Sequence, residues 1–245
     1  MNVKMPTYPY LKPHILATDL DNTIVSEKVP HNELWETLAL ENTSLIYITG
    51  RYKQSAIDLI EREQLPKPDI LVCDVGASIY VGPTYELDEE WARNIKQNDF
   101  EQVKTIATSI GIAQQPINTP WRLAYFAESK QVQILKKSVQ QLNLPVDIVF
   151  SSDKDVDILP AYINKGSALT YILNKCQYKG KVVVAGDSEN DLSLFKLGYP
   201  AIAVGNACEA ILKLPKSQHI HFATEHAAAG VKEVWTKIYG PLSVD

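Results

Sequence analysis

Two carboxylates stand two residues apart near the start of the chain. Asp19 and Asp21 follow the apolar run of residues 14–18. Neighbouring carboxylates repel each other, so stability alone does not explain the pair. A divalent cation removes the repulsion when it binds the side chain of one residue and the backbone carbonyl of the other. The pair therefore predicts a metal site, although an isolated Asp-x-Asp is equally typical of a capped turn.

A second segment offers groups suited to phosphate. Thr49, Gly50 and Arg51 follow the apolar run of residues 43–48 and bring a hydroxyl, an open backbone and a cation. These three groups can all contact phosphate oxygens. Taken alone, the triplet is weak support for such a site, because Thr-Gly often simply ends a strand.

Two further segments carry charge at the starts of predicted helices. Lys165 gains nothing there from the helix dipole, so a bound anion would explain it; a solvated lysine is the alternative. Residues 186–191 read Gly-Asp-Ser-Glu-Asn-Asp, and helix capping needs only one or two of these acids. We expect Asp187 to bind a metal ion. Asp191 would lie over the same site and hold a metal-bound water or Lys165.

The elements that must position these residues alternate along the chain. Short runs rich in Val and Ile read as buried parallel strands, and the stretches between them have the apolar spacing of amphipathic helices. The expected strands cover residues 14–19, 43–49, 69–76, 181–186 and 201–205, and the expected helices cover 31–42, 52–64, 165–176 and 188–198. Strand and helix in repeated succession predict an α/β fold, with a Rossmann-like parallel sheet and helices on both faces.

The middle of the chain departs from this order. It contains an exposed segment at 85–91, helices at 100–111 and 129–143, and strands at 121–127, 146–152 and 154–160. This pattern predicts a smaller inserted α/β domain. We assign residues 1–82 and 160–245 to the core domain and 83–159 to the insertion, with hinges at Gly82-Pro83 and Pro160.

Composition excludes several classes of function. The net charge is −5 and the basic residues are scattered, which is unlike a nucleic-acid or anionic membrane surface. No apolar run reaches eighteen residues, and the first fifteen residues do not resemble a signal peptide. Cys73, Cys176 and Cys208 form no Cys-x-x-Cys pair, so we expect all three to be structural. We expect a cytoplasmic, monomeric protein with a small-molecule substrate.

Together, the four segments resemble the motifs of the haloacid dehalogenase superfamily. That pattern is DxDxT, then Ser or Thr, then Lys, then GDxxxD, and it stands here as residues 19–23, Thr49, Lys165 and residues 186–191. The segment between the second and third motifs lies where that superfamily carries C2-type cap domains. The resemblance spans nearly the whole chain.

The resemblance implies a role for each residue. Asp19 would be the nucleophile that forms an aspartyl-phosphate, and Asp21 the general acid and base. Mg²⁺ would be held by Asp19, the Asp21 carbonyl and Asp187, with Asp191 beside them. The transferring phosphoryl oxygens would be held by Thr49, Lys165 and Asn190.

A narrower resemblance concerns the substrate. Residues 119–127, 150–169 and the Thr-Gly-Arg triplet are similar to sucrose-phosphatases of cyanobacterial and plant type, which implies sucrose 6-phosphate as substrate and a place in sucrose biosynthesis. Lys154, Asp155 and Asp157 form an alternating polar set suited to sugar hydroxyls, and Tyr125 is a candidate sugar platform. A solvated loop and a cap-core tyrosine are the respective alternatives.

One departure keeps other substrates open. Sucrose-phosphatases typically carry Gly-Ser-Glu or Gly-Thr-Glu after the third strand, where the glutamate helps to bind the sugar, whereas this chain has Gly76-Ala77-Ser78. The runner-up substrate is another sugar phosphate, such as a glycosyl-3-phosphoglycerate. The glycerate carboxylate would need extra cations, for which Arg51 and Arg122 are the candidates. A third hypothesis is a non-catalytic sugar-phosphate-binding partner of a synthase.

Overall fold

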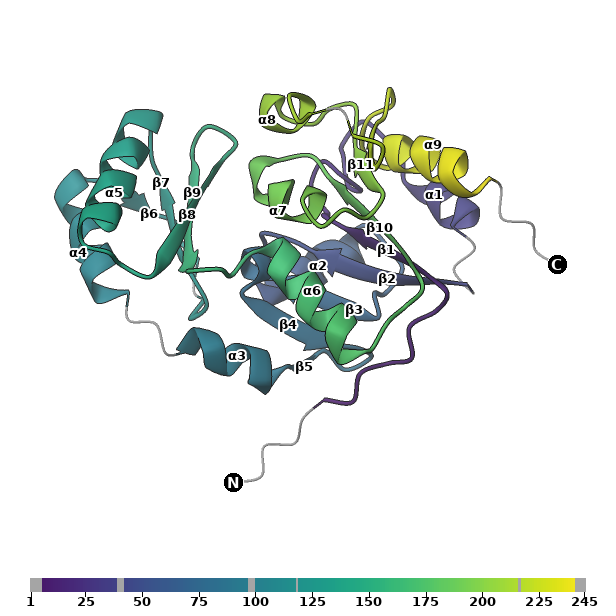
Figure 1. Cartoon of the computed structure of the whole chain (residues 1–245), viewed down its shortest axis with the longest axis horizontal. Helices are drawn as coiled ribbons and strands as arrows, with labels where there is room; N and C mark the ends of the chain where they lie inside the picture. Colours follow the sequence, from purple (N-terminus) through teal and green to yellow (C-terminus); the bar gives the residue numbers. More distant parts are fainter. Residues whose placement is uncertain (1–5, 39–41, 97–99, 118, 216, 241–245) are drawn as a thin grey trace.

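The chain folds around two β-sheets of different size. A computed structural model describes residues 6–38, 42–96, 100–117, 119–215 and 217–240. Figure 1 shows the larger sheet and its helices on the right and the smaller sheet, with α4 and α5 on its outer side, on the left. The predicted α/β fold, with a parallel sheet and helices around it, is confirmed.

The larger sheet has the strand order β12-β11-β10-β1-β2-β3-β4-β5 within the described residues. The six strands from β12 to β3 are parallel to their neighbours, and β4 and β5 are antiparallel at one edge. Its strands are β1 (His14–Thr18), β2 (Thr43–Ile48), β3 (Ile70–Cys73), β4 (Ser78–Val81), β5 (Glu86–Leu87), β10 (Lys181–Gly186), β11 (Ala201–Ala203) and β12 (Ile220–Phe222).

Helices pack on this sheet because its central strands are apolar on both faces. Every residue of β2 and β3 is buried, as expected for strands covered on two sides. Helix α6 packs against α7, which lies with it in front of the sheet in Figure 1, and α1 packs against α9. The helices of this part are α1 (Asn32–Thr37), α2 (Lys53–Arg62), α3 (Glu89–Lys96), α6 (Lys165–Lys175), α7 (Leu192–Phe195), α8 (Glu209–Leu212) and α9 (Ala227–Tyr239).

The smaller sheet, here called the cap sheet, is antiparallel with the order β6-β7-β9-β8. On β9, Val156 and Ile158 pack under the two cap helices, and the alternating residues Asp155 and Asp157 lie on the opposite face of the sheet. The cap elements are β6 (Ala113–Gln114), β7 (Leu123–Phe126), β8 (Val146–Ser151), β9 (Asp155–Pro160), α4 (Glu101–Ile110) and α5 (Ser129–Gln141).

The edge of the larger sheet extends past the predicted domain boundary at residue 83. The turn at Gly82-Pro83 joins β4 to β5, which pair with each other inside the larger sheet. Trp91 of α3 is buried against that core, although we expected residues 85–91 to be exposed, and its Nε1 donates to the Gly76 carbonyl. The first connection to the cap therefore lies beyond α3, and Gly82-Pro83 is a hairpin turn instead of a hinge.

Three other expected elements differ in extent. The strand expected at 69–76 ends at Cys73, because Asp74, Val75 and Gly76 all adopt positive φ and reverse the chain into β4. The helix expected at 188–198 begins as a 3-10 turn at Glu189–Asp191 before α7. The helix expected at 31–42 begins at Asn32 and ends at Thr37, and residues 39–41 lie outside the described residues.

The remaining expectations concern membranes and cysteines. Among the described helices, none has the length and apolar character needed to cross a bilayer. All three cysteines are free thiols, and burial raises the pKa of each, most strongly for Cys73. A raised thiol pKa disfavours the reactive thiolate, which agrees with the structural role we expected.

Candidate active site

The polar segments meet at one edge of the larger sheet. Asp19, Thr49 and Asp187 directly follow β1, β2 and β10, which are adjacent parallel strands. The carboxyl ends of parallel strands open at the same edge, where ligands bind in sheets of this type. The structure thus brings together residues separated by more than 160 positions in the sequence, as the Thr23 hydroxyl shows by donating to Asp187 at 2.8 Å.

Lys165 is the cation at the centre of this site. Its Nζ donates to Asp19 Oδ1 at 2.7 Å and to Asp191 Oδ1 at 2.6 Å, and its side chain is fully buried at the start of α6. Burial alone would lower the pKa of Lys165, but the two carboxylates raise it above its usual value. Lys165 is therefore charged, and its position at a helix N-terminus is explained by two anionic partners.

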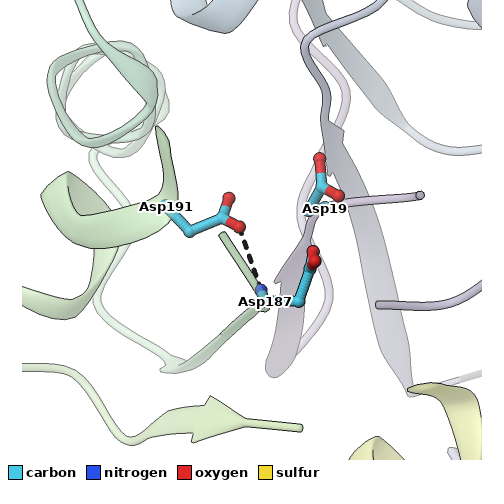
Figure 2. Close-up of side chains that lie close together, drawn as sticks. All are labelled: Asp19, Asp187 and Asp191. Carbon is cyan, nitrogen blue, oxygen red and sulfur yellow. Dashed lines mark hydrogen bonds between the residues drawn. The ribbon is translucent and has the colours of Figure 1, made fainter. Parts of the chain in front are cut away.

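Asp191 is held in place by the backbone. Its Oδ2 accepts from the N–H groups of Asp187 at 3.0 Å and Ser188 at 3.1 Å; Figure 2 shows the first of these bonds. A Cβ atom on Gly186 would lie 2.5 Å from the side chain of Asp191, so this approach requires glycine. Both oxygens of Asp191 are thus engaged, one by Lys165 and one by the turn.

Three carboxylates crowd the site where a metal was predicted. Oxygen atoms of Asp19, Asp187 and Asp191 all lie within 4.8 Å of one another, as Figure 2 shows. Burial, and then the neighbouring carboxylates, raise the pKa of Asp187 to about 7; burial also raises the pKa of Asp19, against the opposing effect of Lys165. One lysine does not neutralise three carboxylates, so the site fits a hard divalent cation. Because Asp191 already bonds Lys165 and the turn, it suits orientation better than ligation.

Asp21 differs from the other carboxylates. Its two oxygens accept from Arg51 Nε and Nη2, each at 2.7 Å, and Arg51 Nη1 donates to Ser55 at 2.8 Å. The side chain of Asp21 is 43% exposed, whereas that of Asp19 is 7% exposed. Its side chain therefore faces the solvent side of the site and lies outside the carboxylate cluster, which leaves its backbone carbonyl as the predicted metal ligand.

Thr49, Gly50 and Arg51, here called the phosphate loop, are fixed by the strained turn that follows β3. The N–H of Val75 donates to the Thr49 carbonyl at 3.1 Å, and the N–H of Asp74 donates to the Arg51 carbonyl at 2.9 Å. Val75 has a φ of 58°, which is unfavourable for a β-branched residue and persists only where the surroundings enforce it. The strained turn thus positions the loop.

A cavity of about 400 Å³ connects these residues to the cap. Its volume lies in the range of about 300–1,000 Å³ in which proteins enclose small molecules. The core contributes Asp19, Asp21, Gly50, Arg51, Asp187 and Asn190 to its wall, and the cap contributes Gln115, Ile117, Arg122, Ser151, Asp155 and Asp157. The site is therefore shared between the two sheets.

The cap residues predicted from the sequence divide into two groups. Asp155 and Asp157 line the cavity from the polar face of β9. Tyr125 does not: it pairs with Val156 and is buried in the cap core, so the alternative to a sugar platform holds. Lys154 is exposed in the turn between β8 and β9 and is not part of the cavity wall. Strand alternation explains the position of Tyr125, which shares the face of its partner Val156, opposite to that of Asp155 and Asp157.

Sequence reasoning missed several residues of the cavity wall, Gln115 among them, and named Arg122 only as a possible partner of a glycerate carboxylate. Gln115 Nε2 donates to Asp155 Oδ1 at 3.0 Å, and Arg122 donates to Asp157. Gln115 directly follows the two-residue strand β6, and no sequence motif marks it as a site residue. Arg122 precedes the apolar run of residues 123–127, and a single cation next to such a run was the available signal. Ser78, which stands where the sequence resemblance led us to expect a glutamate, is fully buried and donates to Asp74 at 2.9 Å.

The fold and the four-part site define the chain as a member of the haloacid dehalogenase fold class. A haloacid dehalogenase-like hydrolase from Bacteroides thetaiotaomicron superposes with a TM-score of 0.69 over 93% of this chain and 100% of that one, at 17% identity. Within this class, the sequence profile of the sucrose-6F-phosphate phosphohydrolase family matches residues 12–236. The chain belongs to that family.

Individual relatives agree with this placement. The sucrose-phosphatase of Synechocystis sp. PCC6803, solved with sucrose and phosphate, has a TM-score of 0.87 and 29% identity over 95% of this chain and 100% of that chain. Sucrose-phosphatase 1 of Nicotiana tabacum is 29% identical over 89% of this chain, which spans 57% of the tobacco protein. Mannosylfructose-phosphate phosphatase of Agrobacterium fabrum is 27% identical over 91% of this chain and 96% of its own length.

Proposed function

We propose that this chain is a phosphatase that hydrolyses a sugar phosphate, with sucrose 6-phosphate as the first candidate. The observation that carries the proposal is the shared cavity, which joins a buried Asp19 beside Lys165 to a polar wall of the cap sheet. A phosphate group fits the core side because catalysis of phosphoryl transfer depends on positioning and charge. Hydroxyl groups fit the cap side, where carboxylate and amide groups converge.

In the first step, Asp19 attacks phosphorus and the ester bond to the sugar oxygen breaks. The leaving alkoxide takes a proton from Asp21, which stands two positions after Asp19 in the sequence and lines the cavity. Lys165, Thr49 and Asn190 bind the phosphoryl oxygens, whose charge spreads during transfer. The product of this step is an aspartyl-phosphate on Asp19 and a free sugar.

In the second step, Asp21 removes a proton from a water molecule that attacks the aspartyl-phosphate. The P–O bond to Asp19 breaks, inorganic phosphate leaves, and Asp21 is again protonated for the next cycle. Arg51 donates to both oxygens of Asp21, so Asp21 can reach the leaving oxygen when Arg51 releases one of these bonds. An incoming phosphate offers Arg51 the alternative partner.

We propose that Mg²⁺ is the cofactor, held by the carboxylates of Asp19 and Asp187 and the carbonyl of Asp21. When bound, this ion neutralises charge between the nucleophile and the phosphate. Asp191 keeps Lys165 and the turn after β10 in place around it. The fit rests on hard oxygen donors and on the excess of buried negative charge.

A release assay across phosphorylated sugars tests the proposal. With MgCl₂ present, we expect phosphate release from sucrose 6-phosphate to exceed that from glucose 6-phosphate and from glycosyl-3-phosphoglycerates. Asp19→Asn should abolish release, because the amide is not a nucleophile, while circular dichroism shows an unchanged fold. If the wild-type protein releases no phosphate from any sugar phosphate, the proposal fails and a non-catalytic binding role, as partner of a sugar-phosphate synthase, takes its place.

A second candidate substrate is mannosylfructose phosphate. Its support is the Agrobacterium relative, which this chain matches over nearly its full length, and the buried Ser78 where the sequence resemblance led us to expect a glutamate. A glycosyl-3-phosphoglycerate has less support, because the two arginines of the cavity wall, Arg51 and Arg122, already pair with carboxylates. Including mannosylfructose phosphate in the panel separates these candidates by the ratio of their kcat/KM values.

The proposal also covers the cellular compartment and the oligomeric state of the protein. The three free cysteines support action in the reducing cytoplasm. We propose that the protein acts as a monomer and receives its substrate from a sugar-phosphate synthase. Size-exclusion chromatography with light scattering measures the mass of the protein alone, which should be that of one chain. The same measurement with a sugar-phosphate synthase shows whether the two proteins form a complex.

A further inference from the structure

Arg122 connects the cap to the core through a buried set of polar contacts. It lies immediately before β7, and its side chain is 4% exposed. Its Nη1 donates to Asp157 on β9, and its Nε lies 3.4 Å from Asp74 Oδ1, on the strained turn of the core. A buried guanidinium between two carboxylates from different sheets is costly to build unless each contact is made.

The same guanidinium reaches the phosphate loop. Arg122 Nη2 donates to the Gly50 carbonyl at 2.8 Å. The carbonyls on either side, those of Thr49 and Arg51, accept from the backbone of Val75 and Asp74. The three consecutive carbonyls of the phosphate loop are thus all bonded, two by the core and the middle one by the cap.

This arrangement fixes a peptide plane at the reacting end of the cavity. Because the Gly50 carbonyl and the Arg51 N–H belong to one planar unit, a contact with the carbonyl sets the direction of both. The same side chain holds Asp157, whose carboxylate lines the sugar end of the cavity. Arg122 therefore contacts both ends of the cavity, through Gly50 at the phosphate end and through Asp157 at the sugar end.

We propose that Arg122 is a positioning residue that determines specificity, holding the phosphate loop and Asp157 in one arrangement so that sugar phosphates are favoured over small phosphate esters. The inference rests on the proposed phosphatase function. Arg122 acts through Gly50 and Asp157 and takes no part in the chemical steps. On the core side, Asp74 Oδ1 lies 3.4 Å from Arg122 Nε, within ion-pair distance but without a hydrogen bond, and Ser78 donates to Asp74 Oδ2.

Steady-state kinetics with two substrates tests the role. In Arg122→Gln we expect kcat/KM for sucrose 6-phosphate, or for the best substrate of the panel, to fall by about 10- to 100-fold, as the loss of charged hydrogen bonds implies. For p-nitrophenyl phosphate, which has no sugar and uses only the phosphate loop, we expect a smaller fall than for the sugar phosphate, because the contact with Asp157 does not matter for this ester. Arg62→Gln, an exposed arginine outside this network, is the matched control and should change neither value.

A double variant protects the test against misfolding. Removing Arg122 alone leaves two buried carboxylates without a cation, so Arg122→Gln combined with Asp74→Asn removes one of them as well. Asn tolerates the positive φ at position 74, so Asp74→Asn does not strain the turn. We expect the double variant to show the same selective loss as the single one. Equal losses on both substrates, or no loss on the sugar phosphate, would overturn the proposal.

A readout independent of activity separates this inference from the proposed function. Because Arg122 ties β7 to the phosphate loop, small-angle scattering should give a larger radius of gyration for Arg122→Gln than for the wild-type and Arg62→Gln proteins. If no sugar phosphate is hydrolysed but the radius increases, the proposed function fails and the cap–core link stands. An unchanged radius in a folded Arg122→Gln protein contradicts the link.

Discussion

At the scale of single residues, the site is a balance of buried charge. Lys165 offsets Asp19 and Asp191, while Asp187 Oδ1 accepts from the Thr23 hydroxyl and Asp187 has no cation of its own among the described contacts. Arg51 forms an ion pair with Asp21 outside this cluster. The nucleophile is therefore surrounded by more negative than positive charge, which disfavours its ionised form until further positive charge arrives.

Replacing Lys165 should show how much of this balance is structural. We expect Lys165→Met to lower the free energy of unfolding by about 3–5 kcal/mol, because two buried carboxylates lose their only shared cation, and to reduce phosphate release strongly. Urea unfolding followed by fluorescence measures the first effect. Lys213→Met, which removes an exposed ion pair with Glu209, should cost less than about 1 kcal/mol. Equal costs for the two variants would contradict the argument.

The raised pKa of Asp187 predicts how metal binding depends on pH. Its folded pKa, about 7, exceeds the ordinary value of 3.8, so in metal-free protein this group stabilises the fold at low pH and loses that effect as the pH rises through about 7. Mg²⁺ binds the ionised carboxylate. We therefore expect the increase in Tm caused by Mg²⁺ to be larger at pH 8 than at pH 5.5.

Differential scanning calorimetry with and without MgCl₂ at the two pH values measures this difference. Asp187→Asn, which retains the shape of the side chain but does not titrate, should lose most of the Mg²⁺-dependent increase at both pH values. An equal Mg²⁺ effect at pH 5.5 and pH 8 in the wild-type protein would show that Asp187 is not the titrating ligand.

At the scale of elements, the site depends on where strands end and how the chain turns there. The strained turn at 74–76 bonds the phosphate loop on one side and approaches the start of α6 on the other. A Cβ atom on Gly76, whose φ is 103°, would lie 2.4 Å from the backbone of Asn164, the N-cap of α6. Asn164 directly precedes Lys165, so this contact helps to set the position of the buried lysine.

Gly76→Ala should therefore be costly. We expect a loss of stability well above the 1–2 kcal/mol that a positive φ alone imposes, together with a lower kcat, because α6 must move to admit the methyl group. Gly111→Ala is the control: its φ is also positive, but no atom lies within 4 Å of the added Cβ. Chemical denaturation and phosphate release of both variants give the comparison, and similar losses for the two would refute the steric explanation.

At the scale of the whole molecule, two sheets enclose one cavity. The chain leaves the core after α3 and returns from β9 to α6 through residues 161–164, so the cap is attached by two connections. The polar face of the cap sheet is directed to the core while α4 and α5 cover its outer face (Figure 1). Closure of such a cap excludes water from the reaction, and opening it releases the product.

Ligands should therefore compact the molecule. We expect the radius of gyration from small-angle scattering to decrease when a phosphate mimic, Mg²⁺ and sucrose are added together, because they contact both sheets. Sucrose alone should have a smaller effect, since it lacks the group that the core side binds. No compaction, with binding established by calorimetry, would contradict the closure.

Much of this protein can be predicted from its sequence. The apolar strands, the acids at their ends and the order of the four segments predict the parallel sheet and bring Asp19, Lys165 and Asp187 to one edge, because parallel strands end together. The sequence also identified Asp155 and Asp157 on the cap. These features are local in origin, because each depends on the period of one element and on the residues directly after that element.

Which side chains contact one another was determined only by the tertiary structure. The bidentate pair of Arg51 with Asp21 depends on how the segments after β2 and β1 lie together. The burial of Tyr125 under the cap helices and the reach of Arg122 to Gly50 depend on which face of the cap sheet meets the core. A strand's alternation separates two faces but does not say which of them another sheet will cover. That choice arises from the packing of segments far apart in the chain, and it determines which side chains line the cavity.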